Sequence, residues 1–132
     1  MPETPETHRE IVEIKKEVRD IKQTLDAQIH QDRERWESLL HKTLRNNTDL
    51  MRVLLAVNGV KSAKEIEREC AIYPMKCWRY LNKLEQNGII FKTGETKRGS
   101  PVYAKNRWYR MLRLDEKVRR ELSSLTTTSA ST

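Results

Sequence analysis

The sequence predicts a mainly α-helical protein with one small β-hairpin, in which a compact domain is flanked by a long N-terminal helix and a C-terminal helix. Apolar residues recur at helical spacing in residues 11–25 and again in residues 108–125. Between these stretches, three short helical patterns precede two β-prone runs that a turn-rich segment separates. These three observations together define the fold class.

Length and composition fit one domain with an additional arm. The chain has 132 residues, of which 36% are hydrophobic and 34% are charged, so it can bury one modest core. It has no run of about 18 apolar residues, the length that a membrane-spanning helix needs. Its polar first residues also lack the apolar stretch of a secretory signal. We therefore expect a cytoplasmic protein without membrane contact.

The basic charge lies in the second part of the chain. Residues 1–44 carry eight Lys and Arg against ten Asp and Glu, whereas residues 45–132 carry 18 against nine. The net charge of +7 at pH 7 thus combines −2 with +9. A compact domain with this excess suits a polyanion, and nucleic acid is the commonest polyanion inside cells. The alternative is a charge excess that serves solubility alone.

Residues 1–45 are predicted to form one long helical arm. Thr7 and Glu10 have the spacing of a capping box, which opens a helix. An apolar seam with alternating steps of three and four residues follows, as in a coiled coil. The seam comprises Ile11, Ile14, Val18, Ile21 and Leu25. A four-residue step then continues the apolar stripe through Ile29, Trp36, Leu40 and Leu44. We interpret the seam as a dimerisation surface, with a protein partner as a further possibility.

Residues 46–106 form the predicted compact domain, which begins with three short helices. Apolar spacing indicates the first helix at residues 50–57. A second capping box, at residues 62–65, opens the next helix. Pro74 fits the first position of a third helix, 74–87, because a missing N–H costs nothing there.

The rest of the chain is predicted to hold a hairpin, a helix and a tail. The two β-prone runs are residues 89–93 and 102–105, and they flank a long basic tip at residues 94–101. An amphipathic helix is expected over residues 107–125. Residues 126–132 are polar and are expected to form a disordered tail.

The segment from Leu81 to Ile90 has the form Leu-x-x-Leu-Glu-x-x-Gly-Ile-Ile. This pattern, with the helices before it, resembles the winged helix-turn-helix superfamily of DNA-binding proteins, in which it closes the recognition helix and enters the wing. The flanking helices look like the dimerisation arms of MarR- and ArsR-type regulators. The resemblance implies a dimer that binds double-stranded DNA, with helix 74–87 in the major groove and wing 92–101 on the minor groove or backbone. It implies transcriptional regulation or a nucleoid role, and a nucleoid-associated location.

Helical periodicity gives candidate DNA contacts without the resemblance. With Cys77, Leu81 and Leu84 facing the core, the opposite face and its flanks carry the candidates. These are Met75, Lys76, Trp78, Arg79, Asn82 and Lys83 on the helix, and Lys92, Lys97 and Arg98 on the wing. A solvated face that binds nothing is the alternative. For Trp78, we favour packing against the N-terminal helix over a ligand contact.

The C-terminal helix carries a second apolar stripe, which we also assign to dimerisation. Its residues are Met111, Leu114, Val118 and Leu122. Beside it, Arg107, Arg110 and Arg113 form a basic ridge. The ridge can extend a phosphate-binding surface or pair with the acidic N-terminal helix, and the sequence does not decide between these roles.

The sequence predicts neither an enzyme nor a cofactor or metal site. It contains no phosphate-cradling glycine loop, no HExxH motif and no Ser/His/Asp pattern. Cys70 and Cys77 lack nearby further zinc ligands and are interpreted as buried, reduced thiols, with a redox switch as the alternative. The main alternative function is a winged-helix interaction module in a larger assembly. RNA binding is more distant, because no aromatic stacking platform is evident.

Overall fold

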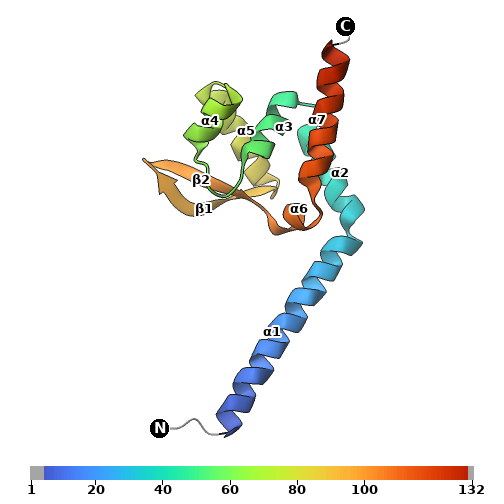
Figure 1. Cartoon of the computed structure of the whole chain (residues 1–132), viewed down its shortest axis with the longest axis vertical. Helices are drawn as coiled ribbons and strands as arrows, with labels where there is room; N and C mark the ends of the chain where they lie inside the picture. The colour runs from blue at the N-terminus through green and yellow to red at the C-terminus, as the bar shows by residue number, and fades with distance from the viewer. Residues whose placement is uncertain (1–4, 131–132) are drawn as a thin grey trace. The chain divides into compact units, whose positions relative to one another are not determined.

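The computed structural model describes the backbone of residues 5–130 and the side chains of residues 15–126. The chain divides into two compact units, residues 1–33 and residues 34–132. The first unit consists of helix α1 (Pro5–Gln31), and the second contains the remaining helices and a β-hairpin (Figure 1).

Helix α1 runs without interruption over 27 residues and presents an exposed apolar seam. The side chains of Val18, Ile21 and Leu25 are 60%, 62% and 53% exposed. Four further residues of the arm on which the sequence interpretation drew lie outside the described side chains: Thr7, Glu10, Ile11 and Ile14.

The prediction of one continuous arm helix up to residue 45 is wrong. The helix is interrupted at Asp32, and a separate helix, α2 (Arg33–Leu44), follows. The amide of Asp32 still donates to the carbonyl of Gln28 at 3.0 Å, so the interruption is local. The apolar stripe changes register after Leu25, and the interruption allows the two registers to occupy separate helices.

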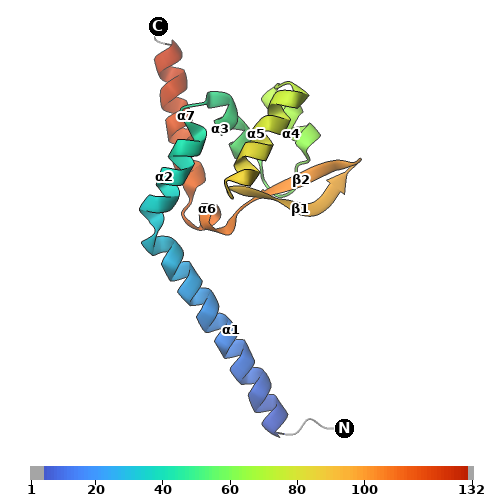
Figure 2. The ribbon, with the colours of Figure 1, turned by 180° about the vertical axis from the view of Figure 1, so that it is seen from behind.

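Three short helices form the centre of the second unit (Figures 1 and 2). They are α3 (Thr48–Ala56), α4 (Ala63–Cys70) and α5 (Pro74–Gln86). The side chain of Asn47 caps α3, and the predicted capping box of Ser62 and Glu65 at the start of α4 is confirmed. The common core of this unit contains Leu50, Val53, Leu54, Ile66, Cys77, Leu81, Leu84, Ile89 and Val118.

The hairpin that follows has longer strands than the sequence predicts. Strand β1 (Ile90–Lys97) pairs antiparallel with strand β2 (Ser100–Lys105). The turn consists of Arg98 and Gly99, both in the left-handed region with φ of 50° and 80°. Such a turn matches the twist of paired strands. The predicted long tip at residues 94–101 is therefore wrong, because six of these eight residues lie in the two strands.

The predicted single helix over residues 107–125 is divided in two. The short helix α6 (Arg107–Met111) ends before Arg113, which has φ of 52°, and α7 (Leu114–Ala130) then begins. Leu112 and Leu114 are both buried. Residues two apart point to different sides of one helix, so the break allows both side chains to enter the core.

Helix α7 also continues beyond the predicted end at residue 125. It reaches Ala130 and so enters the segment 126–132 that the composition predicted to be a disordered tail. No Gly or Pro occurs in this segment to end the helix, and the Thr126 hydroxyl donates to the carbonyls of Leu122 and Ser123, both at 3.0 Å.

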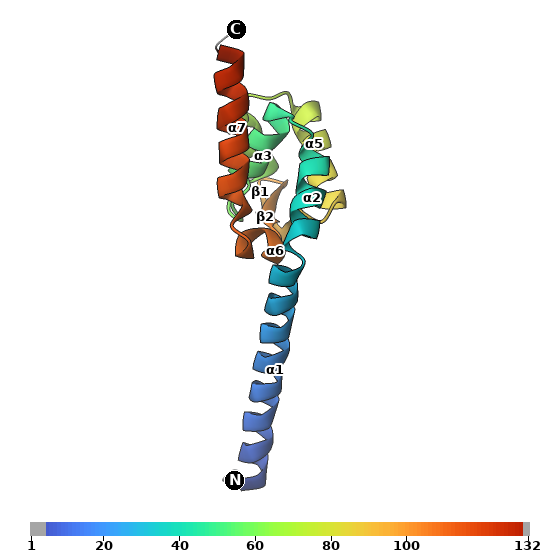
Figure 3. The same ribbon diagram turned by 90° about the vertical axis from the view of Figure 1, so that its right-hand side faces the viewer.

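Two tryptophans join α2 to α6. The rings of Trp36 and Trp108 stack with their centres 4.6 Å apart and an angle of 15° between their planes. The indole N–H of Trp108 donates to the carbonyl of Gly88 at 3.1 Å. Figure 3 shows α7 beside α3 on the same unit. Both tryptophans are therefore packing residues of the second unit.

The order α3–α4–α5–β1–β2 is the architecture of a winged helix-turn-helix domain, and the predicted fold class is confirmed. Helix α5 takes the position of the recognition helix, and the hairpin takes that of the wing. Among the described residues, no helix is both long enough and apolar enough to cross a membrane.

Candidate nucleic-acid interface

Helix α5 is anchored by three buried side chains, which direct its opposite face to solvent. Cys77, Leu81 and Leu84 are buried where α5 packs on α3, α4 and β1. Pro74 lies in the first turn, as predicted. The helical period of 3.6 residues then places Arg79 opposite the buried stripe.

Arg79 and Lys83 are the exposed cations of this outer face. Neither forms an ion pair with another described residue. Asn82 lies close to them on the same face and is partly exposed. A guanidinium, an ammonium and a carboxamide on one helix face are the groups that bind phosphates and base edges.

Lys76, a predicted base contact, is exposed but paired. Its Nζ lies 2.8 Å from Asp49 Oδ2 of α3 and 5.8 Å from the centre of the Tyr80 ring. The hydrogen bond to Asp49 raises the pKa of Lys76, and hydrogen bonds from Lys76 and then from Arg52 lower the pKa of Asp49. The Asn47 carboxamide donates to the Tyr80 hydroxyl at 3.3 Å, so α3 and α5 are joined beside this pair. A phosphate has to compete with Asp49 for Lys76.

Trp78 is 60% exposed, so the preferred interpretation that it packs against other parts of the chain is wrong. Tyr73 and Met75, near the start of the same helix, are 82% and 64% exposed. We refer to these three residues as the α5 apolar group. Helical spacing places Trp78 on the side of α5 that carries Glu85, whose carboxylate lies 3.9 Å from Lys92 Nζ of β1. Trp78 therefore lies on the wing side of the helix.

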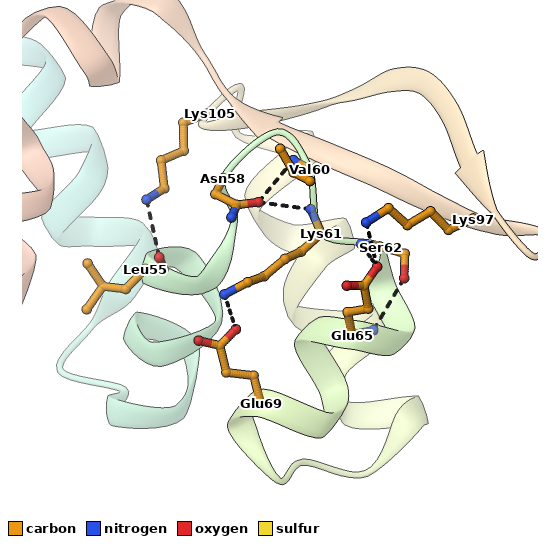
Figure 4. A network of polar contacts seen from close by, with 9 residues as sticks. All are labelled: Leu55, Asn58, Val60, Lys61, Ser62, Glu65, Glu69, Lys97 and Lys105. Carbon is orange, nitrogen blue, oxygen red and sulfur yellow. Dashed lines mark hydrogen bonds and ion pairs between the residues drawn. The ribbon is translucent and has the colours of Figure 1, made fainter.

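The wing presents one unpaired cation at its tip and two paired ones along β1. Arg98 is exposed in the turn and forms no ion pair with a described residue. Lys97 Nζ lies 3.0 Å from Glu65 Oε1, and this bond is the main cause of the lowered pKa of Glu65 (Figure 4). Lys92 pairs with Glu85 at a longer distance. Of the predicted wing contacts, Arg98 is thus the most available to a ligand.

Backbone and side-chain bonds from the loop between α3 and α4 hold the wing in place. The Asn58 side-chain oxygen accepts from the amides of Val60 and Lys61 at 3.0 and 2.9 Å, which fixes the loop (Figure 4). The amide of Gly59 donates to the carbonyl of Tyr103 in β2 at 2.9 Å. The wing is therefore tied to the same framework that positions α4 and α5.

A buried ionic network holds the base of the wing against α7. Lys105 Nζ lies 2.7 Å from Asp115 Oδ1, and the Tyr109 hydroxyl donates to the same oxygen at 2.8 Å. Burial lowers the pKa of Lys105, although the hydrogen bond to Asp115 opposes this effect. Burial also raises the pKa of Tyr109. The network is a structural link between wing and C-terminal helix.

The residues predicted for dimerisation fall into two groups. Val18, Ile21 and Leu25 of α1 are exposed, as an association surface requires. Leu114 and Val118, by contrast, are buried within a single chain because α7 packs on α3, so they have no surface to offer a second copy. Their assignment to a dimer interface is wrong. The other two members of the C-terminal stripe, Met111 and Leu122, are partly exposed.

The cysteines do not form a reactive pair. Cys70 and Cys77 are both free and buried. Burial raises the pKa of both thiols, that of Cys77 to about 12, so little thiolate exists near neutral pH. The interpretation as buried thiols is confirmed, and these facts argue against the redox-switch alternative. Among the described residues, no group of three potential metal ligands is close enough to hold an ion.

The basic ridge before α7 is exposed. Arg107, Arg110 and Arg113 all have exposed side chains, and neither Arg110 nor Arg113 pairs with an acid among the described residues. Their two alternative roles remain open.

Asp49 and Tyr73 were not singled out by the sequence pattern. Asp49 lies on α3, so its pairing with Lys76 of α5 gives no periodic signal in the sequence. Tyr73 occupies a helix-cap position that usually carries a small polar residue.

Comparisons with known proteins add little to this description. No protein-family model matches the chain, and no curated protein sequence matches it. One solved structure, described as "Structure of Disulfide formed AbfR", aligns with 86% of this chain and 81% of its own at 16% identity and a TM-score of 0.46. Overlap at this level carries no argument about fold or function. The class of protein is therefore defined by the chain's own architecture, a winged helix-turn-helix domain with a cationic helix face and wing tip.

Proposed function

We propose that this protein binds double-stranded DNA as a dimer and regulates transcription. Helix α5 enters the major groove, and the wing, residues 92–101, lies on the minor groove or the backbone. This role is one of binding, without a catalytic step or a cofactor. It rests on the fold and on the charge of the second part of the chain, where basic residues outnumber acidic ones by nine.

One observation carries the proposal. Arg79 and Lys83 lie on the outer face of α5 without an ionic partner among the described residues. Arg98, at the wing tip, also has no ionic partner among them. An α-helix fits the major groove, where an arginine or lysine binds guanine edges and neighbouring phosphates. An arginine at a wing tip can enter a narrow minor groove, where the negative potential is enhanced.

The dimer in this proposal is formed by α1. Val18, Ile21 and Leu25 follow each other at steps of three and four residues and are all more than half exposed. Leaving such a seam in water is unfavourable, and a second copy of the helix would cover it. Two recognition helices related by a two-fold axis would then contact half-sites about one helical turn apart.

The salt dependence of duplex binding tests the proposal. Fluorescence anisotropy of a labelled duplex pool, from about 50 to 200 mM salt, should show affinity that falls steeply, because bound cations are released from phosphates. Arg79→Ala and Arg98→Ala should weaken binding and lower the salt slope by about one each, whereas Arg68→Ala, at an exposed position of α4, should not. Lack of binding at the lowest salt would refute the proposal.

A protein-docking role is the second candidate, and the α5 apolar group favours it. Tyr73, Met75 and Trp78 are each at least 60% exposed, and aromatic side chains are enriched at protein interfaces. If docking is the function, duplex binding should be absent, and exchanging Trp78 should release a protein partner while the exchange of Arg98 should not.

A further inference from the structure

The charged residues beside the apolar seam of α1 occupy defined positions relative to it. Val18, Ile21 and Leu25 follow each other at steps of three and four residues. In heptad notation, Val18 and Leu25 are therefore a residues, and Ile21 is a d residue. The residue before an a position is g and the residue after a d position is e, so Glu17 is a g residue and Lys22 an e residue. In a coiled coil, e and g residues flank the core and determine the partner and its orientation.

The seam and its flanking charges are open to solvent. Its three apolar side chains are each more than half exposed. The side chains of Lys15, which is the preceding e residue, Glu17 and Lys22 are exposed as well. None of these three forms an ion pair with another described residue. The next d position holds the polar residue Gln28, so the seam ends at Leu25. Helix α1 thus presents a narrow apolar stripe bordered by unpaired charges.

The signs of these charges distinguish the two orientations that a second α1 can take. In a parallel pair, a g residue lies beside the e residue five positions further along the partner helix. Glu17 of one copy then lies beside Lys22 of the other, and the two-fold symmetry repeats this contact. In an antiparallel pair, g residues lie beside g residues and e residues beside e residues. Glutamate would then meet glutamate, and lysine would meet lysine, which is unfavourable.

The same spacing occurs twice in the sequence of the arm. Glu10 precedes Lys15 by the five residues that also separate Glu17 from Lys22. A charge pattern that complements itself favours a second copy of the chain over an unrelated apolar helix. Parallel packing also brings the two C-terminal ends of α1 together. Because the unit that contains α5 follows this end in the chain, both DNA-binding units then follow from one end of the paired helices.

We propose that α1 pairs with α1 of a second copy as a parallel, in-register coiled coil, in which Glu17 of each copy binds Lys22 of the other. This inference rests on the dimer of the proposed function and specifies the orientation of its two chains. Valine at an a position favours two strands, whereas isoleucine at d also suits three, so the number of associated chains is part of the test.

Charge reversal tests the pairing in the full-length protein without DNA. Sedimentation equilibrium should show that wild type forms a dimer. Glu17→Lys and Lys22→Glu should each raise its dissociation constant about fivefold or more, because each exchange turns two attractive contacts into repulsive ones. The double exchange restores opposite charges and should return the constant to within about twofold of wild type. Lys16→Glu, at an exposed f position, is the matched control and should leave the constant unchanged.

Disulfide formation gives a second, direct measure of orientation. In a parallel, in-register pair, every a residue lies beside the same residue of the other copy, so Val18→Cys and Leu25→Cys should both form a disulfide-linked dimer under oxidised glutathione. In an antiparallel pair, two positions seven residues apart cannot both meet their own copies. The native thiols of Cys70 and Cys77 are buried and should not interfere.

Four results would overturn the proposed pairing. They are a wild type that is monomeric or trimeric, single charge reversals that change nothing, a double exchange as weak as the single ones, and cross-linking at only one of the two cysteine positions. A monomeric wild type would also remove the dimer from the proposed function. A parallel dimer that binds no duplex would instead support the pairing and refute the DNA-binding proposal, so the two failures are distinguishable.

Discussion

Lys76 Nζ lies 2.8 Å from Asp49 Oδ2, so a cation of α5 is bound to α3, the helix that begins the compact domain. Both side chains are partly exposed, so water screens the pair and it contributes little to stability. The pair affects the binding of a polyanionic ligand in two ways. Asp49 both occupies Lys76 and places a negative charge beside the face that we assign to phosphates.

Asp49→Asn is therefore expected to tighten duplex binding. Loss of the carboxylate frees Lys76 and removes a repulsive charge, which should strengthen binding about two- to fivefold at roughly 50 mM salt. The gain should shrink as salt is added, since both effects are electrostatic. Anisotropy titrations with one duplex at several salt concentrations measure it.

A second acid and a double exchange control this result. Glu116→Gln removes one negative charge at an exposed position of α7 that is not paired with Lys76, and should change affinity little. In a Lys76→Ala background, Asp49→Asn should lose most of its benefit, because contacting residues do not contribute additively. A gain of equal size with and without Lys76 would show that the ion pair plays no part.

The same pair predicts a pH dependence of stability. The pKa of Asp49 lies below its ordinary value of 3.8, because Lys76 and Arg52 bind the ionised form. A carboxyl with a depressed pKa in the folded state stabilises that state above its unfolded pKa, and this contribution is lost as pH falls through the folded pKa. Wild type should thus unfold at a higher temperature than Asp49→Asn at pH 6, and the difference should shrink as the pH falls below 3.8 and through the lower pKa of the folded state. Thermal unfolding followed by circular dichroism checks this. A difference that is constant over the whole range would contradict it.

The sequence was sufficient for the elements whose signals are local. Ser62 with Glu65 and Pro74 with its following helix were predicted from residue type and spacing, because a cap depends on a few neighbouring atoms. Arg98 was placed at the wing tip for similar reasons, although the turn proved much shorter.

The predictions that were wrong share one physical cause: they depend on packing between segments that are distant in the sequence. The stripe through Leu114 and Val118 has the same spacing whether it faces a second chain or α3 of its own chain. Periodicity therefore identifies an apolar face but not what covers it. The exposure of Trp78 and the pairing of Lys76 with Asp49 depend in the same way on where other elements lie.

The buried network of Lys105 and Asp115 predicts unequal costs for its two partners. The Lys105 side chain is 9% exposed and that of Asp115 is 34% exposed. Asp115→Asn leaves a buried ammonium without its counter-charge, so it should lower the free energy of unfolding by about 3 kcal/mol. Lys105→Met leaves a carboxylate that water and the Tyr109 hydroxyl can still reach, and it should cost roughly 1 kcal/mol.

Urea unfolding at one fixed protein concentration measures both costs, since association would otherwise alter the apparent stability. Lys117→Met is the matched control. It breaks the more exposed pair with Glu37, in which the atoms are 3.3 Å apart, and should cost less than about 1 kcal/mol. If Lys105→Met proves the more damaging exchange, the ammonium is not the group that depends on its partner.

The α5 apolar group leads to a prediction about base preference. Met75 lies on the outer face of α5 and Trp78 on its wing side, with Asn82 one turn further along. In the major groove, apolar side chains contact the thymine methyl group, and asparagine pairs with two atoms of adenine. These three side chains together favour A·T pairs under the recognition helix, whereas Arg79 favours guanine or phosphate.

Replacing thymine by uracil in the bound duplex removes only the methyl groups and leaves the hydrogen-bonding edges intact. If Trp78 and Met75 contact these methyls, wild type should bind the uracil duplex about threefold to tenfold more weakly, as expected for about 1 kcal/mol of lost apolar contact. Trp78→Ala should bind both duplexes more weakly and with a smaller preference for thymine, because Met75 remains, whereas Arg98→Ala should keep the full preference. Equal affinity of wild type for both duplexes would assign the exposed tryptophan to another partner, because a ring that touches no methyl group gains nothing from thymine.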